Sequence, residues 1–293
     1  MKKQNKYVRF ATHAIAFCLL AMMGMEAVAQ DTTATDTAPA KVVKKKPVKN
    51  TFEGNWILDN QSVMVSYKGT LEMDIQHRFG TVNKGYKDLF GIYSPSNIRI
   101  GLSYVALNNL QVGLGFTKDR LQWDLTGKYA IVKQAISGGW PVSITYFGNI
   151  VADTRPKDNF VNDGDRISYF NQLLIARKIS EKFSIQVAPS YSHYNNIEGF
   201  LDANGKVQKK MKNDQFAIAF MGKYKLTEKT NLLVNYDQPL TQHPMNNPRP
   251  NISFGMEMVT SGHTFQVFAG NYQNILPQSN SYFNQNDYTK GQF

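Results

Sequence analysis

Residues 120–131, with the sequence RLQWDLTGKYAI, alternate between two chemical classes. Apart from one glycine, the odd positions carry large apolar side chains, namely Leu121, Trp123, Leu125, Tyr129 and Ile131. The even positions are mostly polar or charged, namely Arg120, Gln122, Asp124, Thr126 and Lys128. A period of two over this length predicts a β-strand with one apolar face and one charged face.

The same period recurs along most of the chain. We predict further strands at 63–79, 97–106, 109–117, 141–151, 167–179, 183–193, 215–226, 230–236, 252–259 and 263–271. The segments 167–179 and 230–236 alternate less regularly than the others. Together with the segment at 121–131, the pattern indicates eleven strands.

The charged face indicates which side of each strand faces lipid and which faces the interior. A packed soluble core would not tolerate full charges at this density, whereas the lumen of a membrane barrel does. Most segments also have nine or more residues, the length that a tilted membrane-spanning strand needs. We therefore predict an all-β protein, a transmembrane antiparallel up-and-down β-barrel with its apolar face toward lipid, rather than a soluble sandwich.

Composition excludes other classes. After the first thirty residues no apolar run reaches the ~20 residues of a membrane-spanning helix. The single cysteine excludes a disulfide scaffold, and the hydrophobic content of 42% is too high for a disordered chain.

The connections between the predicted strands alternate in length. Those at 80–96, 152–166, 194–214 and 237–251 are long, and those between them are short or medium. Long external loops and short periplasmic turns are typical of outer-membrane barrels. Since bacterial barrels have even strand numbers, we expect about twelve strands, with the last one irregular or truncated after Phe293.

The N-terminus has the features of an export signal. Basic residues precede an apolar core, and Ala27-Val28-Ala29 provides a small-x-small cleavage site, so residues 1–29 are predicted to be a signal peptide cleaved after Ala29. Residues 30–51 are rich in Thr, Ala, Pro and Lys and are predicted to form a disordered periplasmic tether. Lys44, Lys45 and Lys46 within it are candidates for contact with the cell wall or a periplasmic partner, the alternative being a solvated linker. Residues 52–293 are assigned to the barrel.

Four stretches of the chain carry a family resemblance. They are Asp88–Ile92, Ser96–Leu102, Val112–Gly115 and Thr260–Gln266. These stretches resemble an uncharacterised outer-membrane β-barrel family of Bacteroidota-type bacteria, a domain of unknown function, over about residues 52–293. The resemblance implies a fold and an outer-membrane location, and it transfers no catalytic or binding residue.

Turn lengths predict which charged residues line the lumen together. Placing Thr117 opposite Arg120 and Arg99 opposite Thr117 gives a basic mouth of Arg78, Arg99 and Arg120. Glu72, Asp74 and Asp124 then form an acidic layer below it, with Lys128 also pointing inward. Glu257 and Gln266 are predicted to face each other near the periplasmic end. The alternative is a salt-bridge network that only fills the lumen.

These features favour a narrow outer-membrane pore for small polar solutes, anions among them. The alternative is a closed structural or partner-docking barrel, and a third is an outer-membrane hydrolase. The hydrolase would need a nucleophile, a base and an acid, and the close pair Ser261 and His263 has no acid nearby in sequence. We therefore predict a non-enzyme with outer-membrane lipid as a partner and without a cofactor, a metal site or a nucleic-acid partner.

Overall fold

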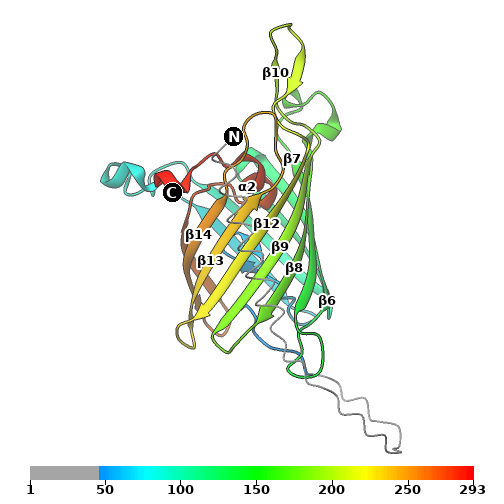
Figure 1. The fold of residues 1–293 in the computed structure, drawn as a ribbon, viewed down its shortest axis with the longest axis vertical. Helices are drawn as coiled ribbons and strands as arrows, with labels where there is room; N and C mark the ends of the chain where they lie inside the picture. Colours follow the sequence, from blue (N-terminus) through cyan, green and yellow to red (C-terminus); the bar gives the residue numbers. More distant parts are fainter. Residues whose placement is uncertain (1–45) are drawn as a thin grey trace, which may run out of the picture.

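One antiparallel sheet of eleven strands dominates the structure, a computed structural model that describes residues 46–293. The sheet curls around a central lumen (Figure 1). Its strands, each paired with the next, are β3 (Leu71–Arg78), β4 (Asn97–Leu107), β5 (Leu110–Thr117), β6 (Gln122–Val132), β7 (Ser143–Asp153), β8 (Ile167–Lys178), β9 (Phe183–Tyr194), β12 (Asp214–Lys225), β13 (Thr230–Pro239), β14 (Asn251–Val259) and β15 (Thr264–Gly270). The eleven predicted strands are therefore confirmed, ten of them to within about two or three residues at each end.

The two faces of the sheet have the predicted orientation. Outward apolar side chains such as Ile75 and Leu125 are 63% and 59% exposed, as expected where lipid replaces water. Inward charged side chains such as Arg99 and Asp124 are 4% and 1% exposed. The apolar face thus points outward and the ionic face surrounds the lumen.

The first predicted strand, at 63–79, is wrong in its N-terminal half. The wall strand β3 begins at Leu71, and Val63 and Val65 are buried inside the barrel instead of facing lipid. Residues 51–65, which we call the plug, enter the lumen and form a short hairpin of β1 (Trp56–Ile57) and β2 (Asn60–Gln61). The plug lies inside because its apolar side chains find a matching apolar surface on the inner wall, described below.

Residues expected at the end of the tether lie against the barrel. Pro47 forms a bridge with Ala135, and the Val48 amide donates to the Gln134 carbonyl at 2.7 Å. The chain between Lys46 and Thr51 therefore follows a turn between two wall strands before it enters the lumen. The signal peptide, its cleavage after Ala29, and Lys44 and Lys45 lie outside the described residues.

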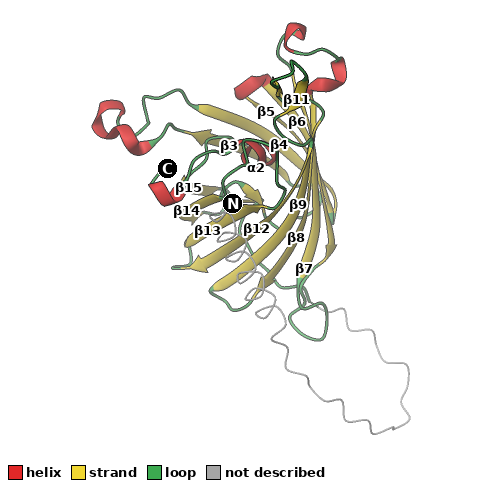
Figure 2. Ribbon diagram, turned by 45° about the horizontal axis from the view of Figure 1, so that its top comes forward, coloured by secondary structure: helices red, strands yellow, loops and turns green. Residues whose placement is uncertain are grey.

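No twelfth wall strand forms within residues 46–293. The segment expected to supply it folds into helix α2 (Pro277–Phe283), which begins with a proline at its first turn and lies in the outer half of the lumen (Figures 1 and 2). The outermost strands of the sheet, β3 and β15, consequently have one paired edge each.

The long connections lie at the end of the barrel that carries α2. The connection after β9 forms a ribbon of β10 (Gly199–Leu201) and β11 (Val207–Lys209), with Gly205 at its tip in the left-handed conformation (φ 73°). Two other long connections contain short 3₁₀ turns, η1 (Val82–Asp88) after β3, and η3 (Lys157–Asn159) and η4 (Asp163–Arg166) after β7. The short connection between β5 and β6 contains η2 (Asp119–Leu121), and the C-terminal segment contains η5 (Tyr288–Lys290). None of the helices in the described part of the chain is both long and apolar enough to cross a membrane.

Candidate functional site: the plugged lumen

One side of the lumen holds an apolar cluster that seals the plug to the wall. Phe52, Ile57, Leu58 and Val63 of the plug are each at most 4% exposed. They share a cluster with inward-facing wall residues, the larger of which are Phe147, Phe170, Leu174 and Leu233. Burying four such side chains contributes about 6–12 kcal/mol at ~1.5–3 kcal/mol each.

Two wall glutamines supply hydrogen-bond partners for the plug backbone. The Gln266 amide donates to the Trp56 carbonyl at 2.9 Å and accepts from the Leu58 amide at 3.0 Å. Gln186 treats the other plug strand in the same way, donating to Gln61 O at 2.7 Å and accepting from Val63 N at 2.8 Å. We call these contacts the amide clamps. Each clamp gives a plug strand one hydrogen-bond donor and one acceptor, as a neighbouring β-strand would.

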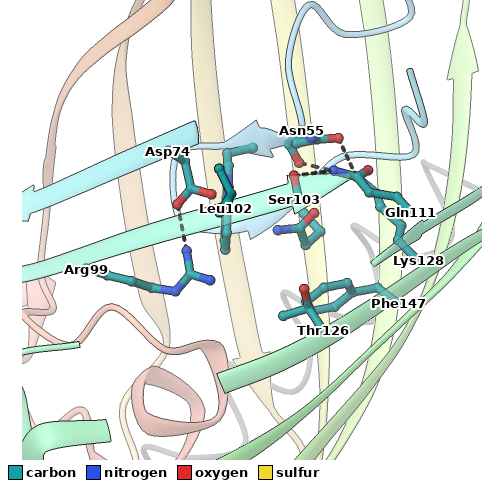
Figure 3. Close-up of a pocket in the computed structure, with 11 residues that line it drawn as sticks. Asn55, Asp74, Arg99, Leu102, Ser103, Gln111, Thr126, Lys128 and Phe147 are labelled. Atoms are coloured by element: carbon teal, nitrogen blue, oxygen red, sulfur yellow. Dashed lines mark hydrogen bonds and ion pairs between the residues drawn. The ribbon is translucent and has the colours of Figure 1, made fainter. Parts of the chain in front are cut away.

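The opposite side of the lumen is ionic. Arg99 binds Asp124 through two parallel hydrogen bonds of 2.9 and 2.6 Å. It also binds Asp74 at 2.6 Å (Figure 3). Its guanidinium also lies 5.6 Å from the Trp56 ring centroid of the plug. A bidentate Arg–carboxylate pair that is almost fully buried is rigid, and removal of one partner leaves an uncompensated charge.

Asn55 connects the plug to this ionic side. It donates to Glu72 at 2.7 Å, and Lys128 lies 3.2 Å from its side-chain oxygen. A cavity of about 20 Å³ lies among these groups, lined also by Ser103, Gln111 and Thr126 (Figure 3). This is room for about one water molecule between the plug and the ionic part of the wall.

The tip of the plug meets helix α2. Asn60 donates to Asn235 at 3.1 Å and to Asp237 at 3.0 Å, while Asn280 of α2 donates to Asp59 at 3.4 Å. The plug and α2 therefore fill the lumen from opposite ends and contact each other.

The connection between β13 and β14 covers α2 from outside. His243 in this connection is buried, accepts from the Lys212 amide at 2.9 Å and lies 2.8 Å from Gln215. Gln215 in turn donates to Ser281 of α2 at 2.7 Å. These contacts make the connection between β13 and β14 a lid that folds inward over α2.

The basic mouth is not assembled as the sequence predicted. The pairing of Arg99 with Thr117 is confirmed, but Thr117 pairs with Gln122, because Asp119–Leu121 form a 3₁₀ turn in place of a two-residue turn. Arg120 consequently lies in the exposed turn, with its guanidinium 5.4 Å from the Phe283 ring centroid. Arg99 contacts the acidic residues directly, so the salt-bridge alternative describes it better.

The remaining predicted lumen residues do point inward. Arg78 is buried and lies over the ring of Phe268, and Glu257 pairs with Gln266, which donates to it at 2.9 Å. Gln186 and Lys223 were missed, and Lys223 binds Glu53 of the plug at 2.9 Å. Their inward position follows from strand alternation, but their plug partners leave no signal in the sequence.

Residues 46–293 contain no group of three or more His, Cys, Asp or Glu side chains placed to hold a metal ion.

The amide clamps predict a specific loss of stability. In Gln186→Leu, the buried Val63 amide and Gln61 carbonyl lose their partner, which costs about 1–3 kcal/mol for each group. Denaturant unfolding of the protein in detergent should show this loss. The matched change Gln208→Leu in the outer ribbon should leave the midpoint nearly unchanged, and equal midpoints for the two variants would contradict the clamp.

Removal of the Arg99 charge should lower the free energy of unfolding more than removal of an amide clamp. Arg99→Met leaves Asp74 and Asp124 buried without a cation and should lower the free energy of unfolding by about 3–5 kcal/mol. Adding Asp74→Asn and Asp124→Asn should restore most of the loss. Arg120→Met, at an exposed arginine of the same chain, is the control and should change the stability little.

His243 predicts a pH dependence of the lid. Burial, followed by the nearby Lys212 charge, lowers the pKa of His243 below its ordinary value. The stabilisation is therefore complete above the unfolded pKa of about 6.5 and is lost as the pH falls below it, because protonated Nδ1 no longer accepts from Lys212. The protection factor of the Lys212 amide, which is the intrinsic exchange rate divided by the observed rate, should therefore fall between about pH 7 and about pH 5. This fall should disappear in His243→Gln, and its persistence there would refute the assignment.

Comparison with known proteins gives a solved structure and a protein family. A solved structure that aligns with this chain is titled "NanC porin structure in rhombohedral crystal form"; it has 8% sequence identity and a TM-score of 0.44, covering 65% of this chain and 87% of that one. No curated protein matches the chain in sequence. Residues 52–293 match the family described as "Membrane bound beta barrel domain (DUF5777)". The family part of the predicted resemblance is thereby confirmed, while the bacterial group stays a prediction. The chain belongs to this family of membrane-bound β-barrel domains.

Proposed function

We propose that the protein is a porin-like outer-membrane channel that is closed at rest by the plug and conducts small polar solutes when the plug is displaced. The supporting observation is that β1 and β2 pair with each other and with no wall strand. The plug can therefore leave the lumen without any break in the hydrogen-bond ladder of the wall. The predicted signal peptide and the membrane-barrel family support an outer-membrane location.

The plugged state is the ground state. The apolar contacts that seal the plug to the wall contribute ~6–12 kcal/mol. A free-energy difference of ~5.5 kcal/mol already corresponds to a population ratio of about 10⁴ between two states. Fewer than about one molecule in 10⁴ should therefore have its plug displaced at equilibrium. Opening consequently requires external work or a binding partner. The Lys-rich residues 41–49 directly precede the plug, so a cell-wall polymer or periplasmic partner that holds them would pull on it.

The proposed solute is small and polar, without a preference for anions. The inward charges have both signs, and Arg99, the centre of the predicted basic mouth, is neutralised by two carboxylates. Displacement of the plug would expose the ionic side of the lumen, where polar solutes can replace the contacts of Asn55.

A closed docking barrel is the second candidate, and the apolar seal favours it. A plug that never leaves would act as an internal core and make the barrel a rigid platform for its outer loops. The hydrolase alternative finds less support, because His263 lies in an exposed turn, where its backbone amide donates to Thr260 at 3.1 Å.

Conductance in planar bilayers separates the two candidates. We expect the full chain to be silent and Ile57→Asp/Leu58→Asp to show single-channel steps, because two carboxylates in the apolar cluster expel the plug. Leu201→Asp in the outer ribbon is the control and should stay silent. Silence of the double variant, with its barrel shown to be intact by heat-modifiable gel migration, would overturn the channel and favour the docking barrel.

A further inference from the structure

Residues 80–94, which we call the outer lobe, expose an unusual concentration of apolar side chains. Tyr86 and Tyr93 are 86% and 77% exposed. The other large apolar side chains of the lobe are also exposed, namely Val82, Leu89, Phe90 and Ile92. Exposed apolar residues in the other outer connections are more scattered, as in Val161, Leu201 and Val207. A cluster of this kind indicates a surface that is covered by a partner.

The lobe has a defined conformation and presents this surface in a fixed way. Asp88 is buried and accepts from the Gly91 amide at 3.1 Å and the Ser94 hydroxyl at 3.0 Å. The Gly80 amide donates to the Gly91 carbonyl at 2.9 Å. A Cβ on Gly91 would lie 2.3 Å from the Gly80 oxygen, so the two ends of the lobe close together only with glycine.

The position of the lobe identifies what covers it. The ribbon β10–β11 extends along the barrel axis, whereas the lobe projects sideways beyond the wall at the level of the outer strand ends (Figures 1 and 2). Ile75 on the outward face of β3 and Phe79, directly after the strand, are 63% and 53% exposed and lead into the lobe. The apolar surface of the lobe thus continues the surface that the barrel presents to lipid.

The charge of the lobe fits a lipid headgroup. Lys84 and Lys87 are exposed, whereas the carboxylate of Asp88 is turned inward, so the exposed ionic groups of the lobe are basic. Tyrosine side chains and lysines beside an apolar face are the composition of an element that lies in the membrane interface.

We propose that the outer lobe lies in the outer-leaflet interface and binds the phosphate of an anionic lipid headgroup through Lys84 and Lys87, with Tyr86, Phe90 and Tyr93 inserted at the acyl boundary. The lobe acts as a lateral anchor beside the seam between β3 and β15. This role is independent of whether the lumen conducts.

Site-directed fluorescence tests the insertion. In a Cys18→Ser background, a fluorophore at Tyr93→Cys in reconstituted vesicles should be quenched by lipids brominated near the headgroup end of the acyl chain. The same fluorophore at Leu201→Cys, on the axial ribbon, should not be quenched. Equal accessibility of both positions to aqueous iodide, without lipid quenching, would overturn the proposal.

Energy transfer tests the headgroup preference. Transfer from the position 93 probe to headgroup-labelled phosphatidylglycerol should exceed transfer to labelled phosphatidylcholine, with local enrichment of about fivefold per lysine. Lys84→Gln/Lys87→Gln should remove the preference and leave the acyl-chain quenching in place. Lys209→Gln/Lys210→Gln in the ribbon region is the control. An unchanged preference in the lobe variant would refute the role of the lysines.

Discussion

The position of the plug depends on one constraint, that a buried backbone group must have a hydrogen-bond partner. The plug enters the lumen without a wall strand beside it, so its amides and carbonyls need partners from side chains. Gln266 and Gln186 provide them, each using both atoms of one amide to hold one plug strand. Apolar packing alone would bury the plug but would not fix its register. The two clamps fix it, because each pairs a carbonyl with the amide two residues further along.

The lumen is divided between two kinds of interaction, and this division explains why it is filled. A barrel of this size is narrow enough for its interior to be filled by side chains and a short insert. Apolar inward residues on β7, β8 and β13 would be exposed to water without Phe52, Ile57 and Leu58 of the plug. The ionic residues on β3, β4 and β6 instead neutralise one another around Arg99. The plug thus has a dry side that holds it and a polar side that water or a solute can compete for.

The wall could be predicted from the sequence, because alternation reports directly which face of a strand meets lipid. The strand around Leu125 alternates regularly, and its structure follows the prediction closely. The plug could not be predicted in this way. Val63 and Val65 happen to continue the alternation of β3, but their burial depends on wall residues distant in sequence, such as Thr145, which donates to the Val63 carbonyl. Helix α2 was missed for a related reason, since Gln278 and Ser281 gain their partners only inside a formed barrel.

The register between strands was predictable where the turn is tight, as for Glu257 and Gln266. The predicted register was wrong where Arg120 belongs to a longer turn.

The plug also connects the two edges of the sheet. Asn55 binds Glu72 on β3, while Trp56 and Leu58 bind Gln266 on β15. Between the same two strands, the Arg78 guanidinium lies 4.6 Å from the centroid of the Phe268 ring. Because backbone groups that face hydrocarbon without partners are costly, any contact that holds β3 and β15 together from inside stabilises the wall. Displacement of the plug therefore costs more than the loss of its own apolar burial, since it also removes the inner bridge across this seam. The position of the plug and the stability of the wall are therefore linked, because the same residues that fill the lumen hold its wall together.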